Sequence, residues 1–322
     1  MTKSTLSASQ VDQLRAFFGE RLKRDVNLGR FTSSRLGGPA DYLISSRDAR
    51  QLADDGAFLW EQDIPTFILG AGSNILISDA GIRQVVMLNR AKAVKFQEHT
   101  EHGPMVRAES GASLGLLARR AVSRGWSGLE WAAGIPGTVG GAVVGNAGAH
   151  GGNMAGNLIL AEILHRKEHI VRRVEWAAKD FAFDYRSSRI KGSSDDYLVL
   201  RADLGLSSSS PKAVRAKMQE FGEHRKQTQP PGASVGSMFK NPPGDYAGRL
   251  IEQAGLKGYR IGDAEISEVH ANFFLNRGEA SAADVRELIR TARERVAEQF
   301  GVRLELEILL IGDWNKDDAD GR

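Results

Sequence analysis

Two glycine-rich segments are the residues of this 322-residue chain whose type and spacing could bind a ligand directly. The segment GAGSN occupies residues 70–74, and GIPGTVGGAVVGNAGAHGG, residues 134–152, holds eight glycines in nineteen positions. Successive backbone N–H groups at a tight turn can form a nest that binds an anion. Glycine also weakens helices and strands, so a run this dense indicates tight turns or close approach of the backbone to another group.

Neither segment matches a standard nucleotide-binding motif. GAGSN lacks the third glycine of the Rossmann fingerprint and is followed by an apolar run typical of a strand, and no Walker motif closes either segment. GAGSN alone is compatible with a plain hairpin turn, and residues 134–152 with a glycine-packed structural corner. Two such segments without a lysine favour a dinucleotide that is held mainly by main-chain groups.

The remaining segments predict helices mixed with hairpins. Apolar residues at helical spacing define one face over 113–126 (Leu114, Leu117, Ala118, Ala121, Val122) and another over 282–300 (Val285, Leu288, Ile289, Ala292, Val296, Phe300). Further helices are expected over 46–60, 211–226 and 246–258, and strands or hairpins over 66–78, 81–89, 93–110, 158–176, 196–206, 260–276 and 302–312. Because these elements do not alternate regularly, the predicted fold class is α+β.

Composition indicates a globular protein with two or three domains. Hydrophobic residues make up 41% of the chain and charged residues 26%, which is ordinary for a globular protein. The chain contains no cysteine, which excludes disulfides and thiolate metal sites. It shows no long apolar run and no secretory signal, so we expect a cytoplasmic protein without a membrane segment.

The charge pattern argues for a small anionic partner or an ordinary mixed surface. The net charge of +3 is spread along the chain, and the basic helix expected over 211–226 lacks interleaved aromatic residues. We therefore expect no nucleic-acid partner. No histidine lies in a metal-binding constellation, so no metal is expected.

Taken in order, the motifs of this chain resemble those of the UDP-N-acetylenolpyruvoylglucosamine reductase family. The matching motifs are FTSSRLGGPADYLI (31–44), GAGSNILISD (70–79), GIPGTVGGAVVGNAGA (134–149), YRSSRIK (185–191), GSMFKNP (236–242), YAGRLIEQAGLKGYRIGDAEIS (246–267), HANFFLN (270–276) and LELEILLIG (304–312). Any one of them could arise by chance, but together they cover nearly the whole chain and are highly specific.

The resemblance implies an FAD-binding fold of the vanillyl-alcohol-oxidase type in two subdomains, with a smaller C-terminal α+β substrate domain. We expect the FAD-binding region at 1–206, with subdomains at about 1–92 and 93–206, and the substrate domain at 207–302, after the linker SSSSP. Residues 303–314 are expected to form a final strand that carries Glu307 and packs back on the FAD region, and 315–322 a disordered tail. The short segment between YRSSR, which ends at residue 189, and the strand expected from residue 196 implies the shorter subgroup of the family, which lacks a substrate-capping insertion.

The resemblance also implies an activity. The family uses NADPH and non-covalently bound FAD to reduce UDP-N-acetylglucosamine-enolpyruvate to UDP-N-acetylmuramate, in peptidoglycan synthesis for the cell wall, cell shape and division. The implied partners are these small molecules, and the oligomeric state stays open. The alternatives are an FAD-dependent oxidase or reductase of the same fold with another substrate, and a flavin- or nucleotide-binding protein without catalysis.

Three positions match the family's catalytic residues: Ser237 as the proton donor, Arg186 beside the substrate carboxylate, and Glu307 as the acidic partner. Hydride addition at C3 leaves negative charge at C2 and its carboxylate, which a guanidinium stabilises and a hydroxyl can neutralise with a proton. Glu305 would share one side of a strand with Glu307 and is the main alternative acid. Taken alone, the motif YRSSR favours a surface arginine at Arg186, and Ser237 is better read as a loop hydroxyl bonded to its own backbone.

The motifs also imply ligand contacts. The positions that match FAD contacts are Arg35, Gly38, Gly70, Ala71, Gly72, Ser73, Asn74, Gly134, Ile135, Gly140, Gly141, Asn146 and Gly148. The positions that match substrate contacts are Tyr185, Arg189, Lys240, Asn241 and Tyr246.

Three residues depart from the family pattern: His150 replaces a tyrosine, Asn153 an acid and Val269 a lysine. We expect His150 to pack or hydrogen-bond rather than to link covalently to flavin, and His270 to be structural.

Overall fold

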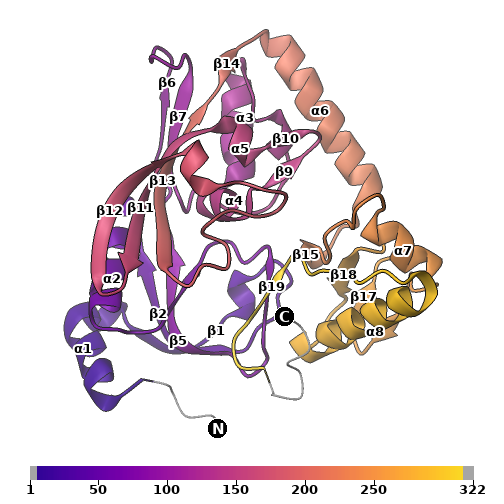
Figure 1. Ribbon diagram of the computed structural model, residues 1–322, viewed down its shortest axis with the longest axis horizontal. Coiled ribbons are helices and arrows are strands. Elements are labelled where there is room, and N and C mark those ends of the chain that lie inside the picture. Colours follow the sequence, from indigo (N-terminus) through magenta and orange to yellow (C-terminus); the bar gives the residue numbers. More distant parts are fainter. Residues whose placement is uncertain (1–5, 315–322) are drawn as a thin grey trace.

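Three β-sheets of four or five strands, with helices packed on them, make up the core of the described residues, 6–314, in this computed structural model (Figure 1). The expected tail at 315–322 lies outside the described residues. The α+β fold class is confirmed, because helices and mainly antiparallel sheets mix without regular alternation. No helix within residues 6–314 is both long and apolar enough to cross a bilayer.

The first sheet mixes parallel and antiparallel pairs. Its spatial order is β1 (Lys23–Asn27), β2 (Pro39–Ser46), β5 (Ile82–Asn89) and β3 (Thr66–Leu69). Strands β2 and β3 each run parallel to β5, while β1 runs antiparallel to β2. Helices α1 (Ala8–Phe18) and α2 (Ala49–Glu61) share an apolar core with it; Asp48 caps the start of α2 by accepting the N–H of Gln51.

The second sheet is antiparallel throughout. Its spatial order is β12 (Ile170–Ala177), β11 (Leu158–Lys167), β13 (Asp196–Gly205), β7 (Met105–Glu109) and β6 (Val94–Gln97). Three helices share its core: α3 (Leu114–Ser123), α4 (Val139–Gly145) and α5 (Met154–Asn157). The hairpins expected over 93–110 and 158–176 are confirmed, and every residue of the predicted inner face of α3 is buried.

The third sheet lies in the C-terminal part of the chain. Its antiparallel order is β15 (Ala233–Ser237), β18 (Phe273–Asn276), β17 (Ala264–Ile266) and β16 (Arg260–Ile261), with α7 (Ala247–Gln253) and α8 (Ala282–Phe300) packed on it. The predicted inner face of α8 is buried except for Phe300, which is 38% exposed because the helix ends there, before the left-handed cap at Gly301. The prediction for Phe300 was wrong.

Helix α6 (Pro211–Thr228) runs from the second sheet to the third (Figure 1). The serines before it are not a free linker, since β14 (Ser207–Ser208) pairs with β8 (Trp126–Ser127). The other short elements are the 3₁₀ turns Gly19–Arg21, Gly29–Phe31, Glu130–Ala132 and Ala178–Phe181, and the pair β9 (Gly148–Ala149) and β10 (Gly152–Asn153).

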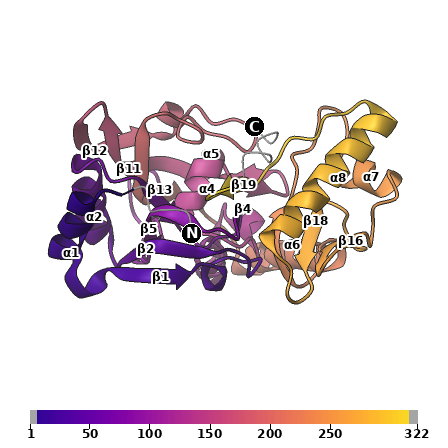
Figure 2. The ribbon, with the colours of Figure 1, turned by 90° about the horizontal axis from the view of Figure 1, so that it is seen from below.

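The end of the described chain returns to the first glycine-rich loop. Strand β19 (Leu309–Ile311) pairs in parallel with β4 (Ile75–Ile77), as Figure 2 shows. The strand expected over 303–314 is therefore much shorter, and Glu307 precedes it. Since β3 and β4 join different sheets, the hairpin alternative for residues 70–74 is wrong.

Candidate active site

Two of the three predicted catalytic residues form an ion pair. Nε of Arg186 lies 2.8 Å from Oε1 of Glu307, and the two side chains are 25% and 16% exposed. Because both side chains are largely withdrawn from water, their attraction is screened less than that of a surface pair. The fold thus joins the YRSSR motif to the C-terminal segment.

The backbone of Arg186 is held in a tight turn. Asp184 and Ser187 exchange two backbone hydrogen bonds of 3.1 Å, so Tyr185 and Arg186 occupy the centre of the turn. Arg186 has a φ of 54°, in the left-handed region that costs a non-glycine residue about 1–2 kcal/mol. Backbone strain of this kind persists where surrounding contacts determine the conformation, often at functional sites.

Ser237 connects to Glu307 through its neighbour in the chain. It is the last residue of β15, and the carbonyl of the next residue, Met238, accepts the N–H of Glu307 at 2.9 Å. An isolated antiparallel bridge joins Phe239 to Leu306. The segments that carry the predicted proton donor and the predicted acid therefore lie side by side.

Asn272 fixes the chain that follows Ser237, and the sequence analysis missed it. Its buried side chain donates to the carbonyl of Phe239 at 2.8 Å and accepts the N–H of the same residue at 2.9 Å. Its own carbonyl accepts the N–H of Met238 at 2.8 Å. The available signal was a polar residue within the apolar run HANFFLN.

Glu305 and Glu307 do not share an environment, contrary to the expectation that they face the same side. The side chain of Glu305 is 72% exposed and pairs with Lys240 at 3.1 Å, whereas that of Glu307 is only 16% exposed and pairs with Arg186. The alternation rule fails because neither residue lies in a regular strand.

Burial and three cations act in opposite directions on Glu307. Burial raises the pKa of its carboxyl above the ordinary value, while the positive charges of Arg186, Lys191 and Lys240 lower it, with burial dominant. Burial, together with the charges of Lys240 and Arg186, lowers the pKa of Lys191, and Glu307 opposes this shift.

Lys191, the last residue of the YRSSRIK motif, is a site residue that the sequence analysis missed. Its Nζ donates to the carbonyl of Arg186 at 2.9 Å. With Lys240 it adds a second and a third cation near Glu307, so the cluster carries surplus positive charge and suits an anionic ligand.

The two glycine-rich segments meet, which is the arrangement that one dinucleotide bound by both would need. A Cβ built on Gly70 would lie 2.9 Å from Oγ1 of Thr138, and the hydroxyl of Ser73 donates to the carbonyl of Pro136 at 3.4 Å. Thr138 also caps the start of α4 by accepting the N–H of Gly141.

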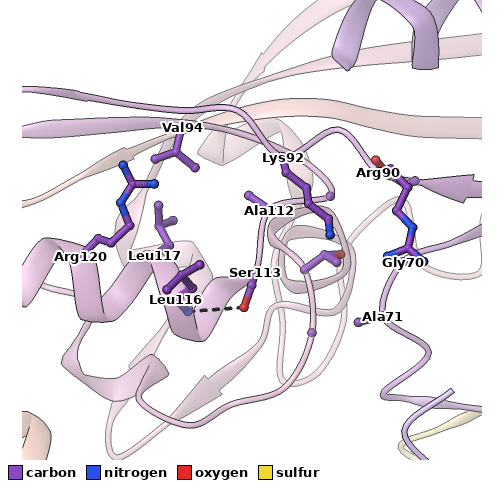
Figure 3. Close-up of a pocket in the computed structure, with 14 residues that line it drawn as sticks. Gly70, Ala71, Arg90, Lys92, Val94, Ala112, Ser113, Leu116, Leu117 and Arg120 are labelled. Atoms are coloured by element: carbon purple, nitrogen blue, oxygen red, sulfur yellow. Dashed lines mark hydrogen bonds between the residues drawn. The ribbon is translucent and has the colours of Figure 1, made fainter. Parts of the chain in front are cut away.

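A cavity of about 290 Å³ opens where these segments meet (Figure 3). Gly70, Ala71, Gly137 and Thr138 line it, as do residues 111–113 at the start of α3. Three cations that the sequence analysis did not single out also line it: Arg90, Lys92 and Arg120. Bare backbone beside positive charge fits an anionic dinucleotide such as FAD.

A second cavity of about 240 Å³ adjoins the first, since Gly70, Ala71 and Arg90 line both. Its other walls come from residues 30–33 and Leu88. Ser33 ties this wall to the first loop and to the third sheet, because its hydroxyl donates to the carbonyls of Gly72 at 3.3 Å and Ser234 at 2.6 Å.

Several of the predicted cofactor glycines are also required by packing of the chain itself. A Cβ on Gly38 would lie 2.0 Å from the carbonyl oxygen of Asp79, and one on Gly72, with φ of 58°, 2.4 Å from that of Phe31. A Cβ on Gly140 would lie 2.8 Å from Cβ of Ser110. Gly140 lies in the 134–152 segment, so the structural-corner alternative accounts for part of the glycine content of that segment.

Further predicted cofactor residues make contacts within the protein. Arg35 has a φ of 60°, and a Cβ on Gly148 would approach the carbonyl of Gly152 at 2.7 Å. A Cβ on Gly134 would meet the side chain of Arg225 at 3.2 Å, while Ile135 packs against the core of the second sheet. Asn74 and Asn146 hydrogen-bond to segments that carry predicted catalytic residues.

The predicted substrate residues do not all lie free for a ligand. Tyr185 and Tyr246 are 51% and 68% exposed, and the guanidinium of Arg186 lies 5.4 Å from the ring centre of Tyr185. Arg189 instead places its guanidinium 5.7 Å from the ring centre of Trp176.

Asn241 also contributes to local structure. Its Oδ1 accepts the N–H of Ala247 at 3.1 Å, at the start of α7. Lys240, next to it, donates its backbone N–H to the carbonyl of Glu305. These contacts fix the FKNP segment beside the segment that carries Glu307.

The residues that depart from the family pattern lie in different environments. His150 stacks on Phe221 of α6, with ring centres 4.2 Å apart, and Val269 is 53% exposed. Nδ1 of His270 accepts the N–H of Asn272 at 3.2 Å, and burial lowers the pKa of this histidine. No cluster of metal-binding side chains occurs within residues 6–314.

Comparisons with known proteins agree with this geometry. Residues 40–172 match the family described as FAD binding domain, and residues 227–311 match the UDP-N-acetylenolpyruvoylglucosamine reductase C-terminal domain. These matches, together with the similar structure below, confirm the expected FAD-binding fold with a C-terminal domain.

Curated relatives match almost end to end. The UDP-N-acetylenolpyruvoylglucosamine reductase of Chloroflexus aurantiacus is 44% identical over 290 residues, covering 89% of this chain and 96% of that protein. The reductase of Rubrobacter xylanophilus is 41% identical over 291 residues, covering 90% of this chain and 95% of that protein. The crystal structure of the Thermus caldophilus reductase aligns with a TM-score of 0.74 at 36% identity, covering 90% of this chain and 98% of that one.

Proposed function

Because the chain belongs to the UDP-N-acetylenolpyruvoylglucosamine reductase family, we propose that it reduces UDP-N-acetylglucosamine-enolpyruvate to UDP-N-acetylmuramate with NADPH. One observation carries this proposal. Arg186 pairs with Glu307, and Glu307 is hydrogen-bonded to the residue after Ser237, beside a loop expected to bind FAD. The reaction would supply peptidoglycan synthesis.

The residues around the glycine-rich loops fit FAD. Main-chain groups of Gly70, Ala71 and Gly137 would lie along the dinucleotide, and Arg90 and Lys92 would offset its pyrophosphate charge. Bound FAD would supply the hydride chemistry for the NADPH-dependent reduction of the enolpyruvyl group.

Arg186 binds the carboxylate of the enolpyruvyl group in this proposal. Hydride addition at C3 places negative charge on C2 and the carboxylate, and a guanidinium held beside them stabilises that charge. Lys191 and Lys240 add positive charge that favours an anionic substrate.

Ser237 donates the proton to C2, and Glu307 acts as a protonated acid toward the developing charge on the carboxylate. Burial favours the protonated form of Glu307, and an arriving substrate anion favours it further. A raised pKa extends the pH range over which a carboxyl keeps its proton and can donate it.

The test is NADPH oxidation by the purified protein without oxygen, with and without UDP-N-acetylglucosamine-enolpyruvate. Turnover that depends on this substrate supports the proposal. A yellow protein that NADPH reduces but this substrate does not reoxidise would leave an FAD-dependent oxidoreductase with another substrate.

A further inference from the structure

The side chain of Asn146 connects the second glycine-rich segment to the turn that carries Arg186. Asn146 follows the last residue of α4 and is 7% exposed. Its Nδ2 donates to the carbonyl of Asp184 at 2.9 Å, and its Oδ1 accepts the N–H of Ala155 at 3.0 Å. Both ends of the buried carboxamide are therefore bonded to protein.

A second bond joins α4 to the same turn. The hydroxyl of Ser188 donates to the carbonyl of Val144 at 2.6 Å. Asn146 and Ser188 therefore hold the chain on both sides of Arg186 against one short helix. Such contacts are what a non-glycine residue with a φ of 54° needs to keep its conformation.

The same helix begins at the wall of the predicted FAD cavity. Thr138, which lines that cavity, is the N-cap residue of α4, and Asn146 is its C-cap residue. The helix spans only Val139–Gly145, so the cavity wall and the Arg186 turn are joined by about two helical turns.

We propose that Asn146 is a positioning residue that holds the Arg186 turn for the substrate carboxylate, rather than a side-chain ligand of FAD. The proposal rests on the proposed function, in which Arg186 binds that carboxylate. It assigns α4 a role in setting the distance between the FAD cavity and the carboxylate site.

The variant Asn146→Gly tests this with little disturbance of the backbone. Asn146 has φ 42° and ψ 58°, a left-handed conformation that glycine adopts without strain. The change removes both side-chain bonds and keeps the helix end. The matched control is Asn153→Gly, which removes a side-chain cap on Gly156 in the adjoining segment but no hydrogen bond to the described turn at residues 184–187.

The measurements separate FAD binding from the two half-reactions. For Asn146→Gly we expect FAD affinity and the rate of flavin reduction by NADPH to stay within about threefold of wild type. We expect reoxidation by the enolpyruvyl substrate to slow at least tenfold, with a higher substrate dissociation constant. Ser188→Ala should change the same half-reaction, and Asn153→Gly neither.

Three outcomes would overturn the proposal. A tenfold loss of FAD affinity with both half-reactions slowed together would make Asn146 a cofactor ligand. Unchanged reoxidation, or an equal loss of both half-reactions with FAD retained, would leave it a purely structural residue.

Hydrogen exchange of the 184–189 peptide tests the positioning role without the substrate. Faster exchange in Asn146→Gly than in wild type and Asn153→Gly supports that role even if wild type fails to use the enolpyruvyl substrate. Unchanged exchange in the peptide contradicts it whatever the substrate.

Discussion

The side-chain amide of Asn74 donates a hydrogen bond to the backbone carbonyl of Glu307 at 3.1 Å. The carbonyl of Asn74 in turn accepts the N–H of Leu309. The first glycine-rich loop, expected to bind FAD, is therefore hydrogen-bonded to the chain at the predicted acid and two residues after it. Because one loop contacts both sites, the effect of each substitution should be measured separately on flavin reduction by NADPH and on reoxidation by the enolpyruvyl substrate.

Ser237→Ala is expected to leave flavin reduction by NADPH near the wild-type rate and to slow reoxidation by substrate about 10²–10⁴-fold. The reason is that only the second half-reaction needs a proton at C2. Stopped-flow absorbance without oxygen measures both steps. Equal loss in both steps would refute the assignment of Ser237 as the proton donor.

Glu307→Gln is expected to slow reoxidation by a similar factor, because an amide is a far weaker proton donor than a carboxyl. The matched control is Glu305→Gln, whose side chain is 72% exposed, and its reoxidation rate should stay within about threefold of wild type. The same stopped-flow assay compares them. The reverse pattern would assign the role of the acid to Glu305.

The pH dependence of reoxidation should report the carboxyl of Glu307. Burial raises its pKa, against the charges of Arg186, Lys191 and Lys240, so the reoxidation rate should fall as the pH rises through that raised pKa. This fall in the rate at higher pH should disappear in Glu307→Gln. A fall that persists in this variant would report the titration of another group.

The same pKa shift has a consequence for stability. With its pKa raised, the folded state binds the proton of Glu307 more tightly than the unfolded state does. Its contribution to the free energy of unfolding is therefore complete below the ordinary pKa of 4.5 and is lost as the pH rises through the raised pKa. In urea titrations, the free energy of unfolding of wild type should therefore fall relative to that of Glu307→Gln as the pH rises.

Arg186→Gly and Arg186→Ala both remove the guanidinium and should both lose reoxidation. Glycine adopts a φ of 54° freely and alanine does not, so the glycine variant should be more stable by about 1 kcal/mol. Urea unfolding of the two apoproteins checks this difference. An alanine variant of equal or greater stability would show that the turn relaxes easily.

Gly70→Ala should weaken FAD binding about tenfold, or about 1.4 kcal/mol, because the added Cβ lies 2.9 Å from Oγ1 of Thr138 in the cavity wall. Gly222→Ala in α6 is the control, since its Cβ would meet no atom within 4 Å. Fluorescence titration of the apoproteins with FAD measures both affinities. Unchanged affinity in Gly70→Ala would remove this glycine from the FAD site.

The sequence by itself determined the features that depend on local spacing. The buried faces of α3 and α8 follow from apolar residues three and four apart, apart from Phe300 at a helix end. The order of the motifs also identified the family, because each motif is a continuous stretch of chain. These properties need no knowledge of distant neighbours.

Only the tertiary structure decided which residues surround Glu307. Glu305 and Glu307 are equivalent by spacing, yet Glu307 is largely withdrawn from water, with contacts to Met238, Arg186 and Asn74, while Glu305 is exposed. Lys191 and Asn146 gained their proposed importance in the same way. Burial, charge and hydrogen bonding are set by residues far apart in the chain, so local sequence cannot determine them.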